Sequence, residues 1–308
     1  VRQFTQPLAQ IATVSNVIQQ TAAASERVFI FLEEEEEVSE STLALTVNRK
    51  RDVPDTETLV SIKGRVSFDH IAFGYASDKI IIRDFSAMIE PGQKIAVVGP
   101  TGAGKTTIVK LLMRFYDVSN GTISIDGHDI RSFRRDELRS LFGMVLQDTW
   151  LFNGTIADNI RYGRLDASDD EVKNAAAAAQ VDHFVRTLPE GYDMVLNEEA
   201  NNISSGQKQL LTIARAILAD PEILILDEAT SSVDTRTEIH IQTAMDNLMQ
   251  GRTSFIIAHR LSTIRNADLI LVMNDGDIVE QGTHPDLLAK GGLYSKLYYS
   301  QFDTADLK

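Results

Sequence analysis

The sequence has no cysteine among its 308 residues. That absence excludes disulfide bonds, zinc sites built from cysteine and a cysteine nucleophile, and it fits a reducing compartment. Long apolar runs are missing as well, because no stretch reaches the roughly 18 consecutive apolar residues that a membrane-spanning helix needs. No basic-then-apolar signal peptide opens the chain. These residues alone therefore predict neither a membrane span nor a secretory leader.

Positive charge is also in short supply. Lysine and arginine number 30 against 44 aspartates and glutamates, which gives a formal net charge of −14. A surface that binds nucleic acid is normally basic, so we expect no nucleic acid partner. The apolar fraction of 43% is ample for a core. The length fits one large domain or two. The chain starts at Val1 rather than methionine, which indicates a fragment of a longer protein or a processed product.

One glycine-rich motif carries the main chemical signal. Residues 99–107 read Gly-Pro-Thr-Gly-Ala-Gly-Lys-Thr-Thr and fit the phosphate-loop pattern G-x-x-x-x-G-K-[ST]. The β-branched run 94–98 before it predicts a buried strand. Apolar residues recur at helical spacing in 106–115 after it and predict a helix. Strand, loop and helix together form the context in which this motif binds phosphate.

Each residue type in the loop suits a triphosphate. Glycines permit backbone conformations in which successive N–H groups point inward, and the following helix adds its positive N-terminal end. Lys105 would reach the β- and γ-phosphates, and the Thr106 hydroxyl would bind Mg²⁺. We expect the whole loop to contact ATP: Gly99, Pro100, Thr101, Gly102, Ala103, Gly104, Lys105, Thr106 and Thr107.

A second set of polar residues follows other apolar strands. Asp227 and Glu228 end the run Ile-Leu-Ile-Leu, and His259 ends another apolar run. Asp227 suits a magnesium ligand held through water, and Glu228 could orient or deprotonate the attacking water. Because the carboxyl ends of parallel strands meet at one edge, Gly99, Gln147, Asp227 and His259 should converge there.

The rest of the chain predicts an organisation around this core. Residues 1–33 are amphipathic at helical spacing, with Pro7 expected to start or kink the helix. That helix either packs on its own domain or is the cytoplasmic end of a membrane helix. A run of acidic residues follows, and a polar, aperiodic segment predicts a linker. The predicted boundaries are helix 1–37, linker 38–62, domain 63–302 with a helical part at about 150–215, and tail 303–308.

Alternation of patterns predicts the fold class. Residues 65–73 and 80–89 alternate apolar and polar side chains, which is typical of antiparallel strands. Residue 144 starts another short strand, and 154–189 are mostly helical in pattern. Apolar strands at 222–227, 253–258 and 269–274 are separated by helical stretches, which favours a parallel α/β core. We find no internal repeat.

With these motifs in order, the chain resembles the nucleotide-binding domain of an ATP-binding-cassette (ABC) transporter. Ile203-Ser-Ser-Gly-Gln207 is similar to the family's Leu-Ser-Gly-Gly-Gln signature, and Ser231-Ser-Val-Asp234 resembles its D-loop. By the same resemblance Gln147 is the Q-loop glutamine, His259 the switch histidine and Tyr75 the aromatic residue that stacks on adenine. The likeness covers residues 64–301. It implies a phosphate-loop NTPase core with a mixed sheet, an antiparallel β subdomain and a helical subdomain.

The wording of two stretches, 147–156 and 258–264, resembles the exporter branch. The resemblance implies an ATPase that drives export from the cytoplasmic face of the membrane, with Mg²⁺ and ATP as cofactors. A missing transmembrane domain would precede Val1, and residues 1–33 would extend its last helix. A second ABC domain would bind head to tail. Lys105, Gln147, Glu228 and His259 would be catalytic, and Thr106, Gln147 and Asp227 would hold the metal. Contacts across the dimer would come from Ser204, Ser205, Gly206, Gln207 and Asp234.

The signature departs from the family pattern at two positions. Ile203 replaces leucine, and Ser205 replaces a glycine that could adopt positive φ more freely. Residues 196–202 also lack the glycines usual before exporter signatures, while Glu228 is intact. Heterodimeric exporters show this combination, with the reverse in the partner chain. We therefore hypothesise a heterodimer in which this chain contributes a weak signature.

Two other classes remain open. A soluble relative in DNA repair or chromosome structure would carry long heptad repeats between the loop and the signature, and none is present. A regulatory module that binds nucleotide without hydrolysis would not need Glu228 or His259. Turnover of ATP by the wild type and by Glu228→Gln discriminates these classes.

Overall fold

The computed structural model describes residues 2–34, 36–37, 40, 44–47, 59–76, 79–146, 149–197, 202–227, 234–257 and 264–301. The chain divides into two compact units, Val1–Glu40 and Ser41–Lys308.

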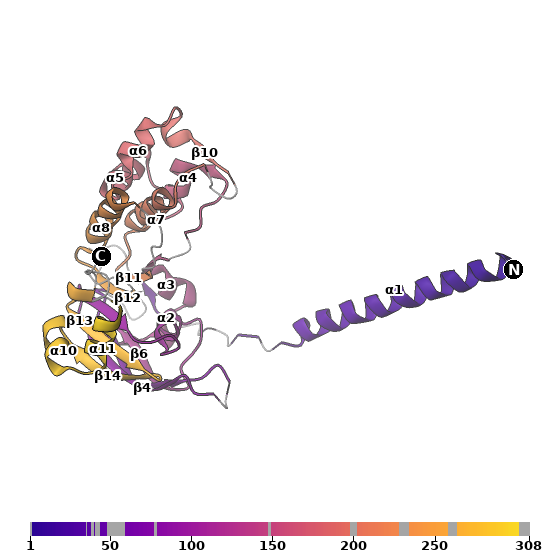
Figure 1. The fold of residues 1–308 in the computed structure, drawn as a ribbon, viewed down its shortest axis with the longest axis horizontal. Helices are drawn as coiled ribbons and strands as arrows, with labels where there is room; N and C mark the ends of the chain where they lie inside the picture. Colours follow the sequence, from indigo (N-terminus) through magenta and orange to yellow (C-terminus); the bar gives the residue numbers. More distant parts are fainter. Residues whose placement is uncertain are drawn as a thin grey trace. The chain divides into compact units, whose positions relative to one another are not determined.

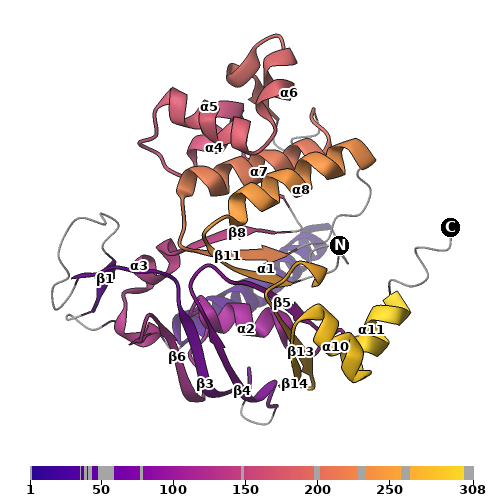
Figure 2. The ribbon, with the colours of Figure 1, turned by 90° about the vertical axis from the view of Figure 1, so that its left-hand side faces the viewer.

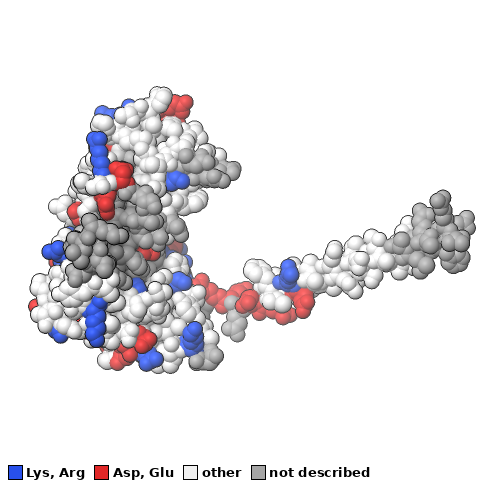
Figure 3. Space-filling model, viewed as in Figure 1, with Lys and Arg blue, Asp and Glu red and all other residues white. Residues whose placement is uncertain are grey.

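The first unit is a single helix, α1 (Arg2–Leu32), which continues through Pro7 (Figure 1). Every side chain described along it is exposed, including the apolar residues Ile11, Val14, Ile18 and Phe29. Most of its described surface is uncharged, and acidic side chains gather after its C-terminal end (Figure 3). An apolar face of this kind calls for a partner surface. Across the described residues, no helix has both the length and the apolar character to cross a membrane.

The second unit is built on a six-stranded sheet in the order β14-β13-β5-β12-β11-β8. Its strands are parallel except β14, which pairs antiparallel with β13. The apolar runs predicted as buried strands form its centre, which confirms the parallel core. The bounds are β5 (Lys94–Val98), β8 (Phe142–Val145), β11 (Ile223–Asp227), β12 (Thr253–Ile257), β13 (Leu269–Asn274) and β14 (Asp277–Gly282).

Alternate residues of these strands feed two separate cores. In β5, Ile95 and Val97 join the core on one face of the sheet, while Ala96 and Val98 join the core on the other. Side chains of a strand point alternately to opposite faces, so a strand covered on both faces must be apolar throughout. Burial on both sides explains why these strands read as continuous apolar runs.

An antiparallel sheet contributes buried side chains to the core that contains Ile95 and Val97. It has the order β4-β3-β6-β7, with β3 (Val66–Phe73), β4 (Ile82–Ile89), β6 (Asn120–Ile125) and β7 (His128–Asp129). Phe68 packs edge-on against Phe85 at 5.1 Å and against Phe255 of β12 at 6.2 Å between ring centroids. Helix α2 (Lys105–Leu112) contributes Ile108 and Leu111 to the same core. The predicted antiparallel pair 65–73 and 80–89 is thus confirmed, with β6 as an additional partner.

The other core, which contains Ala96 and Val98, lies between the six-stranded sheet and a layer of helices. Figure 2 shows this helical layer on one side of the sheet. Helix α7 packs against α4, α5 and α8. The layer comprises α4 (Ile156–Arg161), α5 (Asp169–Ala178), α6 (Asp182–Thr187), η2 (Gly191–Asp193), α7 (Ser205–Ala219) and α8 (Thr235–Met249), with the short pair β9 (Gly154–Thr155) and β10 (Val195–Leu196).

Smaller elements complete the unit: η1 (Ile130–Ser132), α3 (Arg135–Ser140), α10 (His284–Lys290) and α11 (Leu293–Gln301). The predicted linker 38–62 also contains structure. Strands β1 (Thr46–Val47) and β2 (Leu59–Val60) pair in parallel, and Val47, Val60 and Ile62 are buried in the core of the second unit. Part of the segment expected to be a linker is therefore folded into this unit, because its few apolar residues find partners there.

Candidate functional site

The loop between β5 and α2 requires glycine at two positions for different reasons. At Gly99, a Cβ would lie 2.2 Å from the carbonyl oxygen of Met273, so the backbone of β13 leaves no room for a side chain. At Gly104, φ is +101° and a Cβ would meet Ile82 at 2.7 Å. Gly104 is also the N-cap of α2 and offers no side chain to its first N–H groups. The start of this helix is therefore available to an anion.

Lys105 folds back over this loop. Its ammonium donates to the carbonyl oxygens of Gly99 at 2.8 Å and Pro100 at 3.0 Å. Burial lowers the pKa of Lys105, and the carboxylate of Asp227 acts in the opposite direction. Among the described residues, the hydrogen bonds of this partly buried positive charge go to neutral carbonyls, which an anionic ligand could replace with stronger bonds.

Asp227 reaches the same edge of the sheet as the loop. Asp227 of β11 is level with Ile257 of β12, which is level with Val97 of β5. The three strands are parallel, so their carboxyl ends open on one side, where the glycine loop begins. The structure thus brings Gly99, Lys105 and Asp227 together at this edge. In the described part of the chain, no group of three or more His, Asp or Glu side chains is arranged so that it could hold a metal ion.

Three predicted residues lie outside the described residues: Gln147, Glu228 and His259. Each follows a strand of this edge, after β8, β11 and β12 respectively. Their roles stay predictions.

Tyr75 stands beside the loop within a group of aromatic rings. Its hydroxyl lies 3.3 Å from the Thr107 hydroxyl, and the Lys110 ammonium lies 5.7 Å from its ring centroid. Its ring packs edge-on against Phe73 and Tyr116. About half of Tyr75 is exposed, which leaves apolar ring surface for a flat ligand. Sequence reasoning missed Lys110 and Tyr116 because nothing local links them to Tyr75.

The signature segment forms the start of α7. Ser204 is the N-cap: its hydroxyl accepts from the Gln207 N–H at 3.2 Å, and the Gln207 side chain accepts from the Ser204 N–H at 2.8 Å. Ser205 is the first helical residue, and it is not among the residues with positive φ. The expected conformational cost of serine in place of glycine is therefore absent. This removes one reason for regarding the signature as weak.

Other parts of the segment are tied into the fold. Ile203 is buried in the core under the helical layer, and Gly206 is buried as well. Asp234 is the N-cap of α8, where its carboxylate accepts from the N–H groups of Arg236 and Thr237. Gln207 and Arg236 line a common hollow. The starts of α7 and α8 are therefore neighbours.

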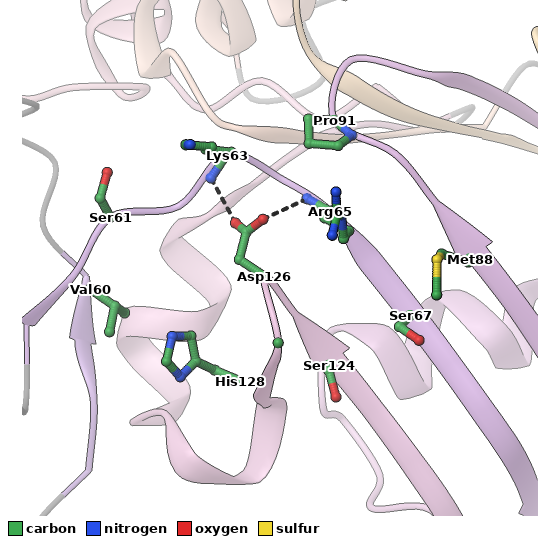
Figure 4. A pocket seen from close by; sticks show the side chains of 11 residues that line it. Val60, Ser61, Lys63, Arg65, Ser67, Met88, Pro91, Ser124, Asp126 and His128 are labelled. Carbon is green, nitrogen blue, oxygen red and sulfur yellow. Dashed lines mark hydrogen bonds between the residues drawn. The ribbon is translucent and has the colours of Figure 1, made fainter.

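A separate hollow lies against the antiparallel sheet (Figure 4). Lys63, Arg65 and His128 stand around it, and Asp126 occupies its floor. The Asp126 carboxylate accepts from the backbone N–H groups of Lys63 at 2.7 Å, Gly64 at 3.0 Å and Arg65 at 3.1 Å. Both oxygens of the Asp126 carboxylate, just after β6, therefore bind the backbone of the segment that leads into β3. We assign this hollow a structural role.

Comparison with known proteins places these motifs in a family. Residues 82–231 match the family model described as ABC transporter. The chain is 55% identical over 297 residues to the fatty acid ABC transporter ATP-binding/permease protein of Mycobacterium bovis, covering 96% of this chain and 45% of that protein. It is 45% identical over 299 residues to human ATP-binding cassette sub-family B member 6, covering 97% of this chain and 34% of that protein.

A solved structure agrees with these relatives. The structure of a bacterial Atm1-family ABC exporter with ATP bound matches 97% of this chain and 50% of its own chain, with a TM-score of 0.79 and 41% sequence identity. The chain thus spans about half the length, or less, of the relatives it matches. The span matched by the family model contains the glycine loop, helices α4 to α7 and the strand that ends at Asp227. The chain therefore belongs to the ABC transporter family, and its second unit is an ABC ATPase domain homologous to those of exporters.

Proposed function

We propose that this chain binds Mg²⁺–ATP at the glycine loop and hydrolyses it, as the motor of an ABC exporter. The observation that carries the proposal is the loop itself. Glycine is required by close approach at Gly99 and by positive φ at Gly104, and a half-buried ammonium stands above it. A glycine loop that leads into an uncapped helix N-terminus, with a lysine beside it, fits a triphosphate.

The chain's own residues divide the work at this site. Lys105 would exchange the Gly99 and Pro100 carbonyls for phosphate oxygens, a charge-assisted bond that gains strength in a partly buried site. Thr106 and Asp227 would hold Mg²⁺, with Gln147, and the ion supplies positive charge to the phosphates. A single carboxylate suffices because Mg²⁺ keeps water and phosphate ligands. Glu228, next after Asp227, would accept a proton from the attacking water, with His259 at the same edge.

The proposed partner is a second ABC domain that binds head to tail. The start of α7 is a helix N-terminus with the buried Gly206 and the half-exposed Gln207 beside it. If the glycine loop of the partner domain holds a γ-phosphate, the N-terminus of α7 would bind that phosphate as a second helix end. Hydrolysis would remove that contact and let the domains part. A heterodimer remains our hypothesis, now resting on Ile203 and residues 196–202 rather than on Ser205.

The proposed location is the cytoplasmic face of a membrane. The relatives named as ATP-binding/permease proteins are about twice the length of this chain, so a membrane part would come from outside it. The exposed apolar side chains of α1 fit a helix that continues such a part. On the second unit, an apolar hollow around Trp150, Tyr162 and Met144 offers a docking surface for the same part.

One comparison tests the hydrolytic role. We expect the 308-residue chain to turn over Mg²⁺–ATP, and Glu228→Gln to lose at least ~10²-fold in rate, as when a general base is removed. Nucleotide binding by the variant should persist. An unchanged rate would contradict the role of Glu228 and favour a binding module, whereas failure of the wild type to bind ATP would defeat the proposal as a whole.

A soluble relative in DNA repair or chromosome structure fits the structure poorly. Among the described residues between α2 and α7, the longest helix is α5 with 10 residues. That class would place a long coiled coil there. The described part of that segment consists of short strands and short helices instead.

A further inference from the structure

Three aromatic rings meet beside the phosphate loop. Phe73 and Tyr75 have centroids 5.0 Å apart at an interplanar angle of 83°, and Tyr75 and Tyr116 are 5.1 Å apart at 86°. Phe73 and Tyr116 close the triangle at 5.6 Å and 51°. Phe73 is buried, whereas Tyr75 and Tyr116 are 48% and 44% exposed. The two tyrosines therefore stand on an apolar base and support each other edge to face.

Tyr116 occupies a firmly held position. The chain leaves α2 through Arg114 at a φ of +52°, and the buried Arg114 side chain donates to Asp117 at 2.9 Å and to the Phe133 carbonyl at 3.2 Å. Farther on, the Ser119 N–H donates to the Ala72 carbonyl at 2.9 Å. The backbone on both sides of Tyr116 is thus fixed to neighbouring elements.

Tyr75 is held differently. It lies in the connection between β3 and β4, just after the β3 residue Phe73. Among the described residues, its side chain contacts Phe73 and three residues on or just after α2: Thr107, Lys110 and Tyr116. The helix that carries the phosphate-binding lysine therefore also supports the exposed ring.

We propose that Tyr116 is a positioning residue for the nucleobase, which holds the ring of Tyr75 in the orientation that a stacked base requires. This inference rests on the proposed function, because it takes Tyr75 as the base-stacking ring of an ATP site. Without the edge-on contact, the Tyr75 side chain gains rotamers that do not present its face, and their entropy must be lost on binding. Tyr116 itself does not contact the nucleotide.

The test separates the base from the phosphates. Dissociation constants are measured for Mg²⁺–ATP and for Mg²⁺–tripolyphosphate, which has no base, using the 308-residue chain and Tyr116→Leu. We expect ATP to bind roughly 2- to 12-fold more weakly to the variant, the range of one aromatic pair, with tripolyphosphate binding unchanged. Tyr116→Phe keeps the ring and should bind both ligands like the wild type.

Phe115→Leu is the matched control. Phe115 is the adjacent ring, similarly exposed at 48%, but it packs against the Arg139 guanidinium at 4.9 Å. Its variant should bind ATP as the wild type does. Equal weakening of both ligands by Tyr116→Leu, or no weakening of ATP binding, would overturn the inference. A wild type that binds neither ligand would instead defeat the proposed function, and this inference with it.

Discussion

The ammonium of Lys105 lies 2.8 Å from the carbonyl oxygen of Gly99, the residue that opens its own loop. Glycine at that position is imposed by the Met273 carbonyl of β13, so the strand beside the loop fixes where the lysine finds its partner. The Lys105 ammonium therefore has hydrogen-bond acceptors within its own loop. These acceptors are neutral carbonyls, and phosphate oxygens could replace them with stronger, charge-assisted bonds.

Replacing Lys105 by methionine should separate binding from folding. The charge is partly buried, and burial already lowers the pKa of Lys105, so a neutral side chain of similar length should not destabilise the fold. We expect ATP turnover to fall at least ~10²-fold, as when a positioned charge donor is removed from an active site. Turnover is measured by phosphate release and stability by thermal unfolding. Retained turnover would show that Lys105 is not the phosphate ligand.

A pair of glycine variants tests the cradle. Gly99→Ala places a Cβ against the Met273 carbonyl, whereas at Gly127, φ is +85° and no atom lies within 4 Å of a Cβ. Gly127→Ala should cost only about 1–2 kcal/mol of unfolding free energy, from the left-handed backbone. Gly99→Ala should cost more and abolish ATP binding. Denaturant unfolding and ATP titration of both variants check this, and equal behaviour of the two would contradict the steric argument.

Ser205→Gly tests whether the signature is weak. Since Ser205 is the first residue of α7 with helical backbone, glycine there relieves no strain and should cost roughly 0.5 kcal/mol of helix stability. We expect turnover within about twofold of the wild type, because a helix N-terminus tolerates either residue. A large rise in turnover would contradict this expectation and would show that serine at position 205 weakens the signature through its backbone conformation.

Ser204→Ala should act on the same helix through its cap. The variant removes the acceptor for the Gln207 N–H and half of a capping box. We expect a loss of about 1 kcal/mol in unfolding free energy. Ser168, which caps α5 with Glu171 in the same way, provides the control. Its alanine variant should show a similar loss of stability but no change in turnover, whereas Ser204→Ala should lower both.

His284 predicts how stability depends on pH. Burial, and after it the positive charge of Arg265, lowers the pKa of His284 below the value of about 6.5 that is usual for histidine. Its Nδ1 lies 2.7 Å from the Tyr294 hydroxyl oxygen. The unfolded chain therefore takes up this proton first as pH falls, so stability decreases below about pH 6.5 and levels out below the folded pKa. His284→Gln should flatten this part of the profile. Identical pH profiles of unfolding free energy for the two proteins would exclude His284 as the cause.

The sequence predicted those features whose physical constraint acts over a few neighbouring residues. The run 94–98, the glycines after it and the helical spacing from Thr106 together predict strand, cradle and helix, because burial, positive φ and helix periodicity each act over a few residues. The same holds for Asp227 at the end of its strand. Gln147, Glu228 and His259 fall outside the described residues, so their placement stays a prediction.

The sequence by itself determined the phosphate loop, the central apolar strands with helical stretches between them, and the acidic end of β11. Only the tertiary structure decided that β6 joins β3, that Val47 and Val60 are folded into the second unit, that Ser205 is helical and that Tyr116 supports Tyr75. The physical reason is that those contacts join segments far apart in the chain. Their energy depends on packing partners that no local pattern specifies.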